Sequence, residues 1–165
     1  MKIAFLDRDG TIMKDYPDSI WGQIETPEFF DDTFDALRSI QEKGYKIIII
    51  TNQYIIGEKF ITEAQYKNFT DLYTDIFKKR HIDILDIFYC PHPRTTNCKC
   101  HKPNTGMIEN AVNKYDNIDI SKSFFVGDSE CDESLAKSIN IKFFKINYQN
   151  LKNPIIKLTN IIPYI

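Results

Sequence analysis

The sequence of 165 residues lacks a long hydrophobic run, a large charge excess of either sign, and any repeated or low-complexity segment. Its purely apolar stretches span only a few residues, so none reaches the length of a membrane-spanning helix. The formal net charge of −2 gives no broad attraction to nucleic acid or to an anionic membrane. The N-terminus shows no signal-peptide pattern, and we therefore expect a cytoplasmic protein that binds no membrane.

Cysteine is scarce as well, with four in the chain, and three of these lie close together beside a histidine. Disulfides are rare in cytosolic proteins, so this grouping favours a metal site over a disulfide framework. The fourth cysteine, Cys131, falls on a predicted helix and is expected to fill space in the core. The length suits one domain, residues 1–165, and no insertion is long enough to form a separate cap domain.

Short apolar runs alternate along the chain with longer amphipathic segments. This alternation predicts an α/β fold in which helices cover both faces of a mainly parallel, five-stranded sheet. The helix at 62–79 begins with a capping-box pattern from Thr62 to Gln65. Its apolar residues repeat at helical spacing: Phe69, Leu72 (or Tyr73) and Ile76. The predicted strands are 2–6, 45–50, 85–89, 123–126 and 141–146, and the predicted helices are 31–43, 62–79, 107–115 and 130–139.

Two further segments are not part of this alternation of strands and helices. Residues 13–30 contain Pro17, Gly22 and Pro27 and are expected to form a loop or flap over the site. Trp21 lies in this flap, where it either contacts substrate or packs. The apolar segment 155–165 is expected to cover a sheet edge or to meet a partner.

Two aspartates stand directly after the first predicted strand, on either side of Arg8. Side chains at i and i+2 of a strand point the same way, so Asp7 and Asp9 can face one point in space. Two carboxylates at such a short distance repel each other unless a cation or a shared proton lies between them. A turn with local Asx-type hydrogen bonds is the alternative. We interpret the pair as half of a magnesium site that includes a nucleophile.

Polar residues also follow the second and fourth predicted strands. In parallel sheets, ligands bind beyond the carboxyl ends of the strands. With Asp7 and a main-chain carbonyl near Asp9, Asp128 would give magnesium the oxygen ligands that it prefers, and Asp132 would support them. A phosphate would meet Lys102 and the polar groups of 51–53, which are Thr51, Asn52 and Gln53.

The loop 90–102 contains two short hooks, Cys90-Pro-His92 and Cys98-Lys-Cys100. Three cysteines and one histidine form a standard tetrahedral set for a structural zinc ion, with no open position for chemistry. Such a zinc would hold the loop and carry Lys102 toward the phosphate. The alternative is three reduced cysteines beside an exposed histidine.

The ordered motifs Asp-Arg-Asp-Gly-Thr, Thr-Asn-Gln, Lys-Pro and Gly-Asp-x-x-x-Asp resemble those of the haloacid dehalogenase-like phosphatase superfamily. The chain is more narrowly similar to the histidinol-phosphatase and D-glycero-D-manno-heptose 1,7-bisphosphate 7-phosphatase subfamily. The resemblance covers nearly all of residues 1–146. It implies a Rossmannoid three-layer sandwich of the haloacid dehalogenase type, with a catalytic Mg²⁺ and a structural Zn²⁺.

The resemblance also implies a covalent mechanism. Asp7 would attack phosphorus and form an aspartyl-phosphate, while Asp9 would protonate the leaving oxygen and later activate water. The substrate would be a small phosphorylated metabolite, such as histidinol phosphate or a sugar bisphosphate. Arg8, His101 and Asp132 would support the residues that touch it.

The motifs depart from the family pattern in three places. His101 stands where arginine is usual, Tyr54 and Ile55 replace small residues, and Ser129 replaces a residue that is often basic. These changes remove positive charge that a bisphosphate would need. The short metal loop likewise favours histidinol phosphate, whose amine or imidazole could meet an acidic flap residue, Asp18 or Glu25.

Two other functions stay open at this point. A site without a large cap could admit a DNA 3′-phosphate, although the chain has no basic stripe to bind nucleic acid. The departures are also compatible with a non-catalytic phosphate-binding module. We expect a monomer or a small homo-oligomer.

Overall fold

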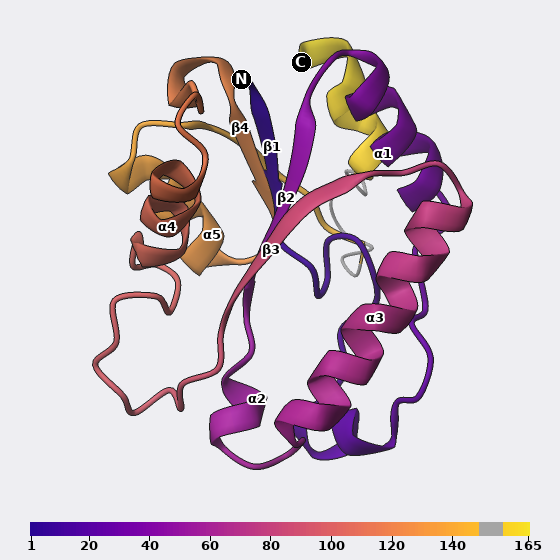
Figure 1. The fold of residues 1–165 in the computed structure, drawn as a ribbon, viewed down its shortest axis with the longest axis vertical. Helices are drawn as coiled ribbons and strands as arrows, with labels where there is room; N and C mark the ends of the chain where they lie inside the picture. Colours follow the sequence, from indigo (N-terminus) through magenta and orange to yellow (C-terminus); the bar gives the residue numbers. More distant parts are fainter. Residues whose placement is uncertain (149–156) are drawn as a thin grey trace.

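The computed structural model describes residues 1–148 and 157–165. One parallel sheet lies at its centre, with the strand order β3-β2-β1-β4-β5 (Figure 1). The strands are β1 (Ile3–Leu6), β2 (Lys46–Asn52), β3 (Ile84–Cys90), β4 (Phe124–Gly127) and β5 (Lys142–Lys145). The five-stranded parallel sheet predicted from the sequence is therefore confirmed, with each strand shifted by only one or two residues.

The four predicted helices are also present. They are α1 (Thr33–Glu42), α3 (Glu63–Lys79), α4 (Gly106–Lys114) and α5 (Glu130–Ser138). The sequence did not predict α2 (Tyr54–Gly57) or the 3₁₀ helices η1 (Asp18–Gln23), η2 (Ile120–Lys122) and η3 (Leu158–Tyr164). Elements of one or two turns are too short to establish a hydrophobic period.

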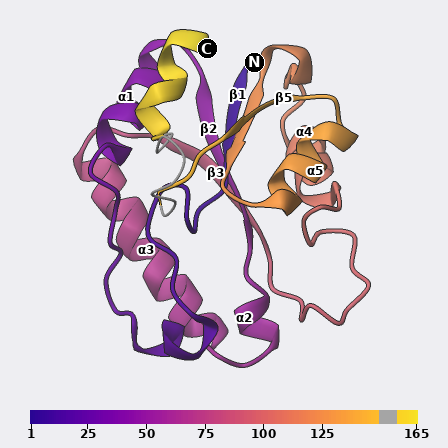
Figure 2. The same ribbon diagram turned by 180° about the vertical axis from the view of Figure 1, so that it is seen from behind.

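The helices divide between the two faces of the sheet. Helices α1 and α3, together with η3, cover one face, and α4 and α5 cover the other (Figures 1 and 2). Within β1, Ala4 and Leu6 belong to the first core, whereas Ile3 and Phe5 belong to the second. Alternate residues of every central strand are thus buried on opposite faces, which explains why these strands are apolar throughout.

Helix α3 begins with the predicted capping box. The hydroxyl of Thr62 accepts a hydrogen bond from the backbone N–H of Gln65 (3.1 Å), and the Gln65 side chain accepts one from the N–H of Thr62 (2.9 Å). Of the two alternatives at the centre of the helix, Tyr73 is fully buried and Leu72 is exposed. The helix therefore presents Tyr73 and Phe77, four residues apart, to the core.

The flap 13–30 leaves and rejoins the domain at one place. Met13 bridges to Phe29, and the N–H of Lys14 donates to the carbonyl of Glu28 (2.8 Å). Between these points, Trp21 in η1 packs edge-on against Phe69 of α3. The flap is therefore fixed to α3 by an aromatic contact.

The C-terminal segment was expected to cover a sheet edge or to meet a partner. Residues 155 and 156 lie outside the described residues, and η3 packs mainly on α1, where Leu158 and Ile161 join the core. The segment η3 also contacts the edge strand β5, where the ammonium of Lys142 donates to the carbonyl of Tyr164 (2.6 Å). The described part of the segment therefore packs on a helix beside the sheet edge, and contact with a partner stays a prediction. Within the described part of the chain, no helix combines the length and apolarity that crossing a membrane requires.

Candidate active site

Two of the predicted acidic residues meet because their strands are neighbours. Asp7 follows β1 and Asp128 follows β4, and these strands pair in parallel with Leu6 opposite Val126. The N–H of Asp7 donates to the carbonyl of Val126 (2.9 Å), which fixes the end of β1. The carboxylates of Asp7, Asp128 and Asp132 offer oxygens within 4.8 Å of one another. Asp7 and Asp128, two of the three predicted magnesium ligands, thus lie together, and Asp132, which was predicted only to support them, joins the group from the first turn of α5.

Lys102 enters this group from the metal loop and is almost completely buried. Its ammonium lies 2.7 Å from a carboxylate oxygen of Asp7 and 2.7 Å from one of Asp132. It also donates to the carbonyl of Ile50 at the end of β2 (3.0 Å). Burial alone would lower the pKa of Lys102, but the two carboxylates outweigh it and raise the pKa, so the side chain stays charged.

The charges in this group leave room for a divalent cation. Burial raises the pKa of Asp7 well above its usual value, and repulsion from neighbouring carboxylates adds to this against the attraction of Lys102. Burial, followed by repulsion from Asp132, raises the pKa of Asp128 to about 6. Three carboxylates facing one ammonium need two further positive charges, and an oxygen-rich set of this kind suits Mg²⁺. Asp7, Asp128 and Asp132 therefore fit a magnesium ion.

Asp9 lies beside this group but is held by other partners. Arg8 binds both of its carboxylate oxygens, through Nε and Nη2, each at 2.8 Å. The amide of Gln53 donates to Asp9 as well (2.8 Å) and accepts from Arg8 (3.0 Å). The three side chains form a closed network, so Asp9 has a fixed orientation and a compensated charge. The main-chain contact of Asp9 with magnesium stays a prediction.

The polar residues at the carboxyl end of β2 serve mainly to hold their neighbours. Asn52 accepts from the N–H of Lys102 (2.8 Å) and donates to its carbonyl (3.2 Å). The hydroxyl of Thr51 accepts from the amide of Gln53 (2.8 Å). These contacts place Lys102 and Gln53 correctly, while the cavity still exposes part of each residue to a ligand.

A cavity of about 190 Å³ opens above these residues. Two of its lining residues, Asp15 and Cys131, could not be predicted from the sequence, because the flap has no period and a lone cysteine carries no signal. Cys131 is only half-buried and lines this cavity, so the expectation that it fills the core is wrong. The lining residues are Asp7, Asp9, Asp15, Asp18, Trp21, Thr51, Asn52, Gln53, Tyr54, Ile55, Lys102, Asp128, Ser129 and Cys131.

Gly10 is required where the chain turns away from Asp9. Its φ is +75°, and a Cβ atom there would lie 2.2 Å from a carboxylate oxygen of Asp128. Only glycine combines this backbone conformation with so close an approach of another side chain. Gly10 thus lets the loop after β1 pass against Asp128.

His101 belongs to the metal loop and does not line the cavity. Its ring is centred 6.0 Å from that of Tyr54, and its buried Nδ1 atom has no hydrogen-bond partner among the described residues. Burial, and then the charges of Lys102 and Arg94, lower the pKa of His101. It is therefore a neutral neighbour of Lys102 at neutral pH.

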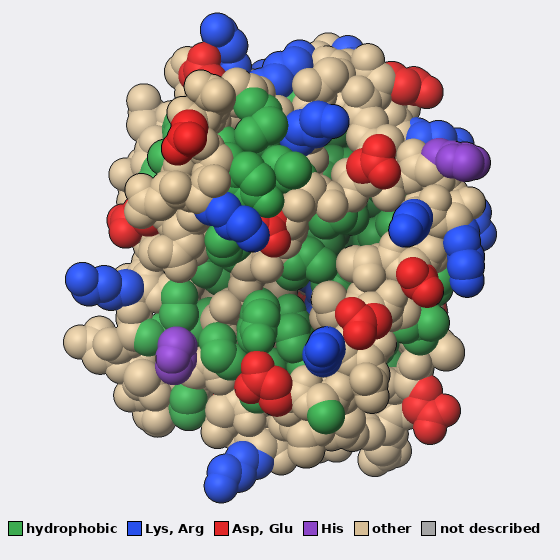
Figure 3. Space-filling view, viewed as in Figure 1, with side chains coloured by type: hydrophobic (Ala, Val, Ile, Leu, Met, Phe, Trp, Pro, Cys, Tyr) green, Lys and Arg blue, Asp and Glu red, His purple; other side chains and the backbone are tan. Residues whose placement is uncertain are grey.

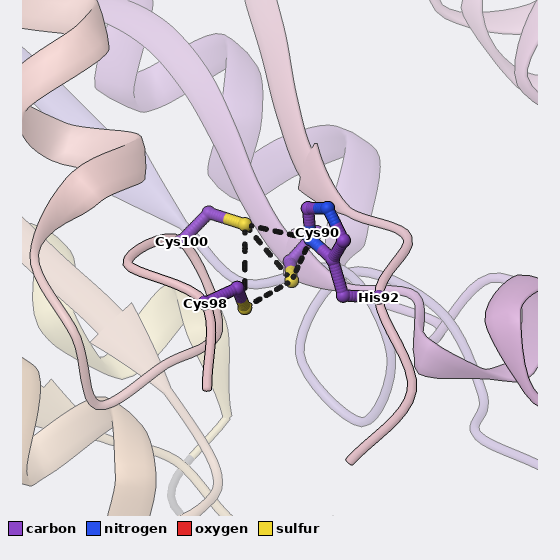
Figure 4. A group of neighbouring side chains, drawn as sticks. All are labelled: Cys90, His92, Cys98 and Cys100. Carbon is purple, nitrogen blue, oxygen red and sulfur yellow. Dashed lines mark hydrogen bonds between the residues drawn. The ribbon is translucent and has the colours of Figure 1, made fainter. Parts of the chain in front are cut away.

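The four predicted ligands of the metal loop face one another (Figure 4). The sulfur atoms lie 3.1 to 3.6 Å apart, and Nδ1 of His92 lies 3.1 Å from the sulfur of Cys100. A tetrahedron with zinc–sulfur bonds of about 2.3 Å has edges of about 3.8 Å, slightly longer than these separations. The side chains of Cys90, His92, Cys98 and Cys100 thus fit a zinc ion with only small adjustments.

The known proteins that resemble this chain in sequence are phosphatases of one family. The family model described as polynucleotide kinase 3 phosphatase matches residues 2–147. The chain is 40% identical over 147 residues to the "Probable D-glycero-D-manno-heptose-1,7-bisphosphate 7-phosphatase" of Thermoplasma volcanium, with 87% of this chain and 97% of the relative covered. It is 43% identical over 139 residues to the D-glycero-alpha-D-manno-heptose-1,7-bisphosphate 7-phosphatase of Photorhabdus laumondii, with 80% and 74% covered.

Two further matches differ in kind. The chain is 33% identical over 161 residues to the histidine biosynthesis bifunctional protein HisB of Campylobacter jejuni, covering 94% of this chain but only 45% of that protein. Among solved structures, the D,D-heptose 1,7-bisphosphate phosphatase of B. bronchiseptica, crystallised with magnesium and phosphate, superposes with a TM-score of 0.84. Its identity is 20%, with 99% of this chain and 97% of that chain covered, so this likeness shows the fold.

Proposed function

The chain belongs to the haloacid dehalogenase superfamily of phosphatases, to the D-glycero-D-manno-heptose 1,7-bisphosphate 7-phosphatase type, and on this premise we propose how it acts and on what. It hydrolyses one phosphate monoester of a sugar bisphosphate, with Asp7 as the nucleophile and Mg²⁺ as the cofactor. The observation that carries this proposal is the meeting of Asp7 and Asp128, at the carboxyl ends of β1 and β4, with the buried side chains of Asp132 and Lys102.

In the first step, a carboxylate oxygen of Asp7 attacks phosphorus in line with the ester oxygen that leaves. The phosphorus–ester bond breaks as the aspartyl-phosphate forms. The ammonium of Lys102, 2.7 Å from Asp7, offsets part of the repulsion between the anionic nucleophile and the anionic substrate. Asp7, Asp128 and Asp132 would hold Mg²⁺, which supplies further positive charge to the phosphoryl oxygens when it is bound.

Asp9 moves the protons in both steps. It gives a proton to the alkoxide that leaves, and in the second step it takes one from the water that attacks the aspartyl-phosphate. That water frees Asp7 and releases inorganic phosphate. The bidentate contact of Arg8 and the amide of Gln53 keep Asp9 turned to one position for both transfers. A positioned acid–base group of this kind contributes on the order of 10²–10⁴ in rate.

A heptose bisphosphate is the first candidate substrate because the relatives of 40% and 43% identity carry that name. Histidinol phosphate is the second, and a specific observation favours it. Asp15 and Asp18 line the cavity, and the guanidinium of Arg94 is already paired with Glu58 (2.6 Å) and Asp18 (3.2 Å). An acidic wall complements an amine or imidazolium better than a second phosphate.

The surface charge gives less support to a polynucleotide 3′-phosphate as the substrate than to a small metabolite. On the face drawn in Figure 3, Lys and Arg side chains alternate with Asp and Glu side chains, and no stripe of one sign forms there. Affinity for nucleic acid depends on neutralising several phosphates at once. A non-catalytic binding module is less favoured, because Asp7, Asp128 and Lys102 lie together and Asp9 is oriented beside them, as the proposed reaction requires.

The test is release of inorganic phosphate with Mg²⁺ from heptose 1,7-bisphosphate, histidinol phosphate and a 3′-phosphorylated oligonucleotide. Asp7→Asn should lose activity by at least about 10³, since it removes the nucleophile. Asp35→Asn is the matched control, because Asp35 is an exposed aspartate of α1. The proposal fails if the wild type releases no phosphate from any of these compounds, or if Asp7→Asn is as active as Asp35→Asn.

A further inference from the structure

Arg94 joins three segments that surround the active site. It lies in the metal loop, between the two hooks that carry the cysteines and the histidine. Its Nη2 atom lies 2.6 Å from a carboxylate oxygen of Glu58, the residue after α2, and 3.2 Å from one of Asp18 in the flap. Its guanidinium also lies over the ring of Tyr54, 4.2 Å from the ring centre. Helix α2 lies between η1 of the flap and the metal loop (Figures 1 and 2), so one side chain connects all three.

The contact between Arg94 and Glu58 is specific in its geometry. One carboxylate oxygen of Glu58 accepts from the backbone N–H of Arg94 (3.0 Å) and from its Nε (2.9 Å), and the other accepts from Nη2 (2.6 Å). Bidentate pairing with a carboxylate fixes the orientation of the guanidinium plane. Beside this pair, the N–H of Gly57 donates to the carbonyl of Pro91 (2.9 Å), and a Cβ at Gly57 would lie 2.4 Å from Pro93. The metal loop is therefore docked closely on α2, and this docking holds Arg94 in place.

The contact between Arg94 and Asp18 reaches the wall of the active-site cavity. Asp18 and Tyr54 line this cavity, whereas Arg94 and Glu58 do not. One carboxylate oxygen of Asp18 accepts from the hydroxyl of Tyr54 (3.0 Å), and the other accepts from Nη2 of Arg94 (3.2 Å). Because Asp18 is the first residue of η1, these two hydrogen bonds tie the flap to α2 and to the metal loop.

The same contacts affect the charge of the cavity wall. Among the described residues that line the cavity, five are aspartates and only Lys102 is a cation. A phosphate ester is anionic, so a carboxylate without a cationic partner repels it. Arg94 offsets the charge of Asp18 from outside the cavity. Its side chain is 51% exposed, and exposed ion pairs contribute little to folding, so Arg94 can be replaced without loss of the fold.

We propose that Arg94 is a positioning residue for substrate binding, which acts through Asp18 and Tyr54 without touching the substrate. It holds the start of η1 against α2 and offsets the charge of Asp18, so an anionic ester meets an ordered and less acidic wall. The substrate effect rests on the proposed function, whereas the hold on the flap needs no substrate. Within the described residues, the hydrogen bonds of Arg94 go to Glu58 and Asp18. They do not involve the reacting group around Asp7, so loss of Arg94 should raise KM and leave kcat nearly unchanged.

Acrylamide quenching of Trp21 fluorescence measures the hold on the flap. Trp21 is the chain's single tryptophan, lies in η1 with Asp18 and is 6% exposed. In Arg94→Gln, the Stern–Volmer constant should rise by about twofold or more, because a flap with fewer contacts opens more often. Arg94→Lys keeps the charge but loses the bidentate contact, so its constant should lie between those of wild type and Arg94→Gln. The matched control is Arg38→Gln, since Arg38 is also about half exposed and pairs with Asp35 at 3.2 Å. Equal quenching in Arg94→Gln and Arg38→Gln would overturn the proposal.

Steady-state kinetics test the effect on substrate binding. The substrate is heptose 1,7-bisphosphate or histidinol phosphate, whichever wild type hydrolyses faster with Mg²⁺. Arg94→Gln should raise KM by about fivefold or more and change kcat by less than about twofold, and Arg38→Gln should match wild type in both. An unchanged KM, or a loss confined to kcat, would overturn the positioning role. If wild type hydrolyses neither compound, the proposed function fails for these substrates, while the quenching experiment still decides whether Arg94 holds the flap.

A double-mutant cycle shows whether Arg94 acts through Asp18. The charge that Arg94 offsets is absent in Asp18→Asn, so adding Arg94→Gln to this variant should raise KM by less than about twofold. The full rise of KM in this background would show that Arg94 acts by another route and would overturn the proposal. The zinc content of Arg94→Gln should equal that of wild type. A lower content would assign the change to a disturbed metal loop and would also overturn the proposal.

Discussion

Lys102 is the residue on which the electrostatics of the active site depend most. One buried ammonium is shared by Asp7 and Asp132, and the carbonyl of Ile50 completes its hydrogen bonds. Removing one partner of a buried ion pair leaves the other charge uncompensated. Lys102→Met should therefore lower the free energy of unfolding by about 3–5 kcal/mol and abolish phosphate release.

Urea denaturation of the metal-free protein measures this loss, and Lys114→Met provides the control. Lys114 also pairs with an aspartate, Asp86 at 2.8 Å, but it is 58% exposed. An exposed pair contributes only about 0–1 kcal/mol, so the control should unfold almost like wild type. Equal stability of the two variants would contradict the central role of the buried ion pairs.

Gly10 decides how closely the loop after β1 approaches Asp128. In Gly10→Ala, the new Cβ would meet a carboxylate oxygen of Asp128 at 2.2 Å, so this carboxylate must move. We expect phosphate release to fall by about 10²-fold or more, because a misplacement of about 1 Å at a catalytic site has an effect of that size. Steady-state kinetics at several Mg²⁺ concentrations measures this loss.

Gly44→Ala separates the steric effect from the backbone effect. Gly44 also has a positive φ, +81°, but a Cβ there meets only Lys2, at 3.6 Å. This variant should lose about 1–2 kcal/mol of stability from the left-handed backbone and keep its activity. The explanation is wrong if both variants lose activity to the same extent.

At the scale of elements, the loop from Cys90 to Lys102 connects a predicted metal site to the catalytic lysine. Metal analysis of the purified protein should find about one zinc per chain, since four ligands fill a tetrahedral site. Cys98→Ser removes one ligand and should lower both the zinc content and the melting temperature. Phosphate release should fall with them, because Lys102 follows Cys100 by two residues.

Cys131→Ser is the control for this experiment. Cys131 lies on α5 and is absent from the four-residue cluster of the metal loop. The zinc content and melting temperature of the Cys131→Ser variant should match those of wild type. A wild type that is stable without any bound zinc would exclude a structural metal in the loop.

The flap and α2 are joined by Tyr54, whose hydroxyl donates to Asp18 (3.0 Å). Burial, and then this hydrogen bond with Asp18, raise the pKa of Tyr54 to about 12. Between the ordinary value of about 10 and about 12, the folded protein therefore binds more protons at this site than the unfolded chain does. The contribution of Tyr54 to stability is present below this window and is lost as the pH rises through it.

Tyr54→Phe should accordingly reduce the loss of stability between about pH 9 and about pH 11. Urea midpoints at the two pH values give the measurement. Tyr164→Phe serves as the control, because Tyr164 is the most exposed large hydrophobic side chain in the described part of the chain. An identical pH dependence in wild type and Tyr54→Phe would show that the contact with Asp18 does not matter.

At the scale of the whole molecule, the distribution of charge bears on the size of the substrate. The net charge is −2, and the face in Figure 3 carries both signs side by side. A nucleic-acid substrate would gain affinity from several lysines or arginines in a row and would lose it with added salt. We expect the KM for a 3′-phosphorylated oligonucleotide to change less than about twofold between about 50 and about 200 mM KCl. A steep rise of KM with salt would instead indicate an extended nucleic-acid interface.

Much of the fold could be predicted because its signals are local. The run Ile47–Ile50 is apolar on both sides, which is what a strand covered by helices on both faces requires. The cap at Thr62 could be predicted because a capping box involves residues only three apart. The helix α2 and the contact of η3 with α1 could not, because a single turn has no period and a docking surface is formed by distant segments.

The sequence by itself determined that Asp7, Asp9 and Asp128 stand just beyond the ends of two strands, since an apolar run followed by polar residues is a local pattern. It also determined the four side chains of the metal loop, because short hooks bring neighbouring ligands together. Only the tertiary structure decided that Arg8 and Gln53 bind Asp9. The same holds for the hydrogen bonds between Asn52 and the backbone of Lys102, and for the position of Trp21 in the walls of two cavities. These contacts join residues far apart in the chain, and their geometry depends on how the flap, the sheet and α3 pack together.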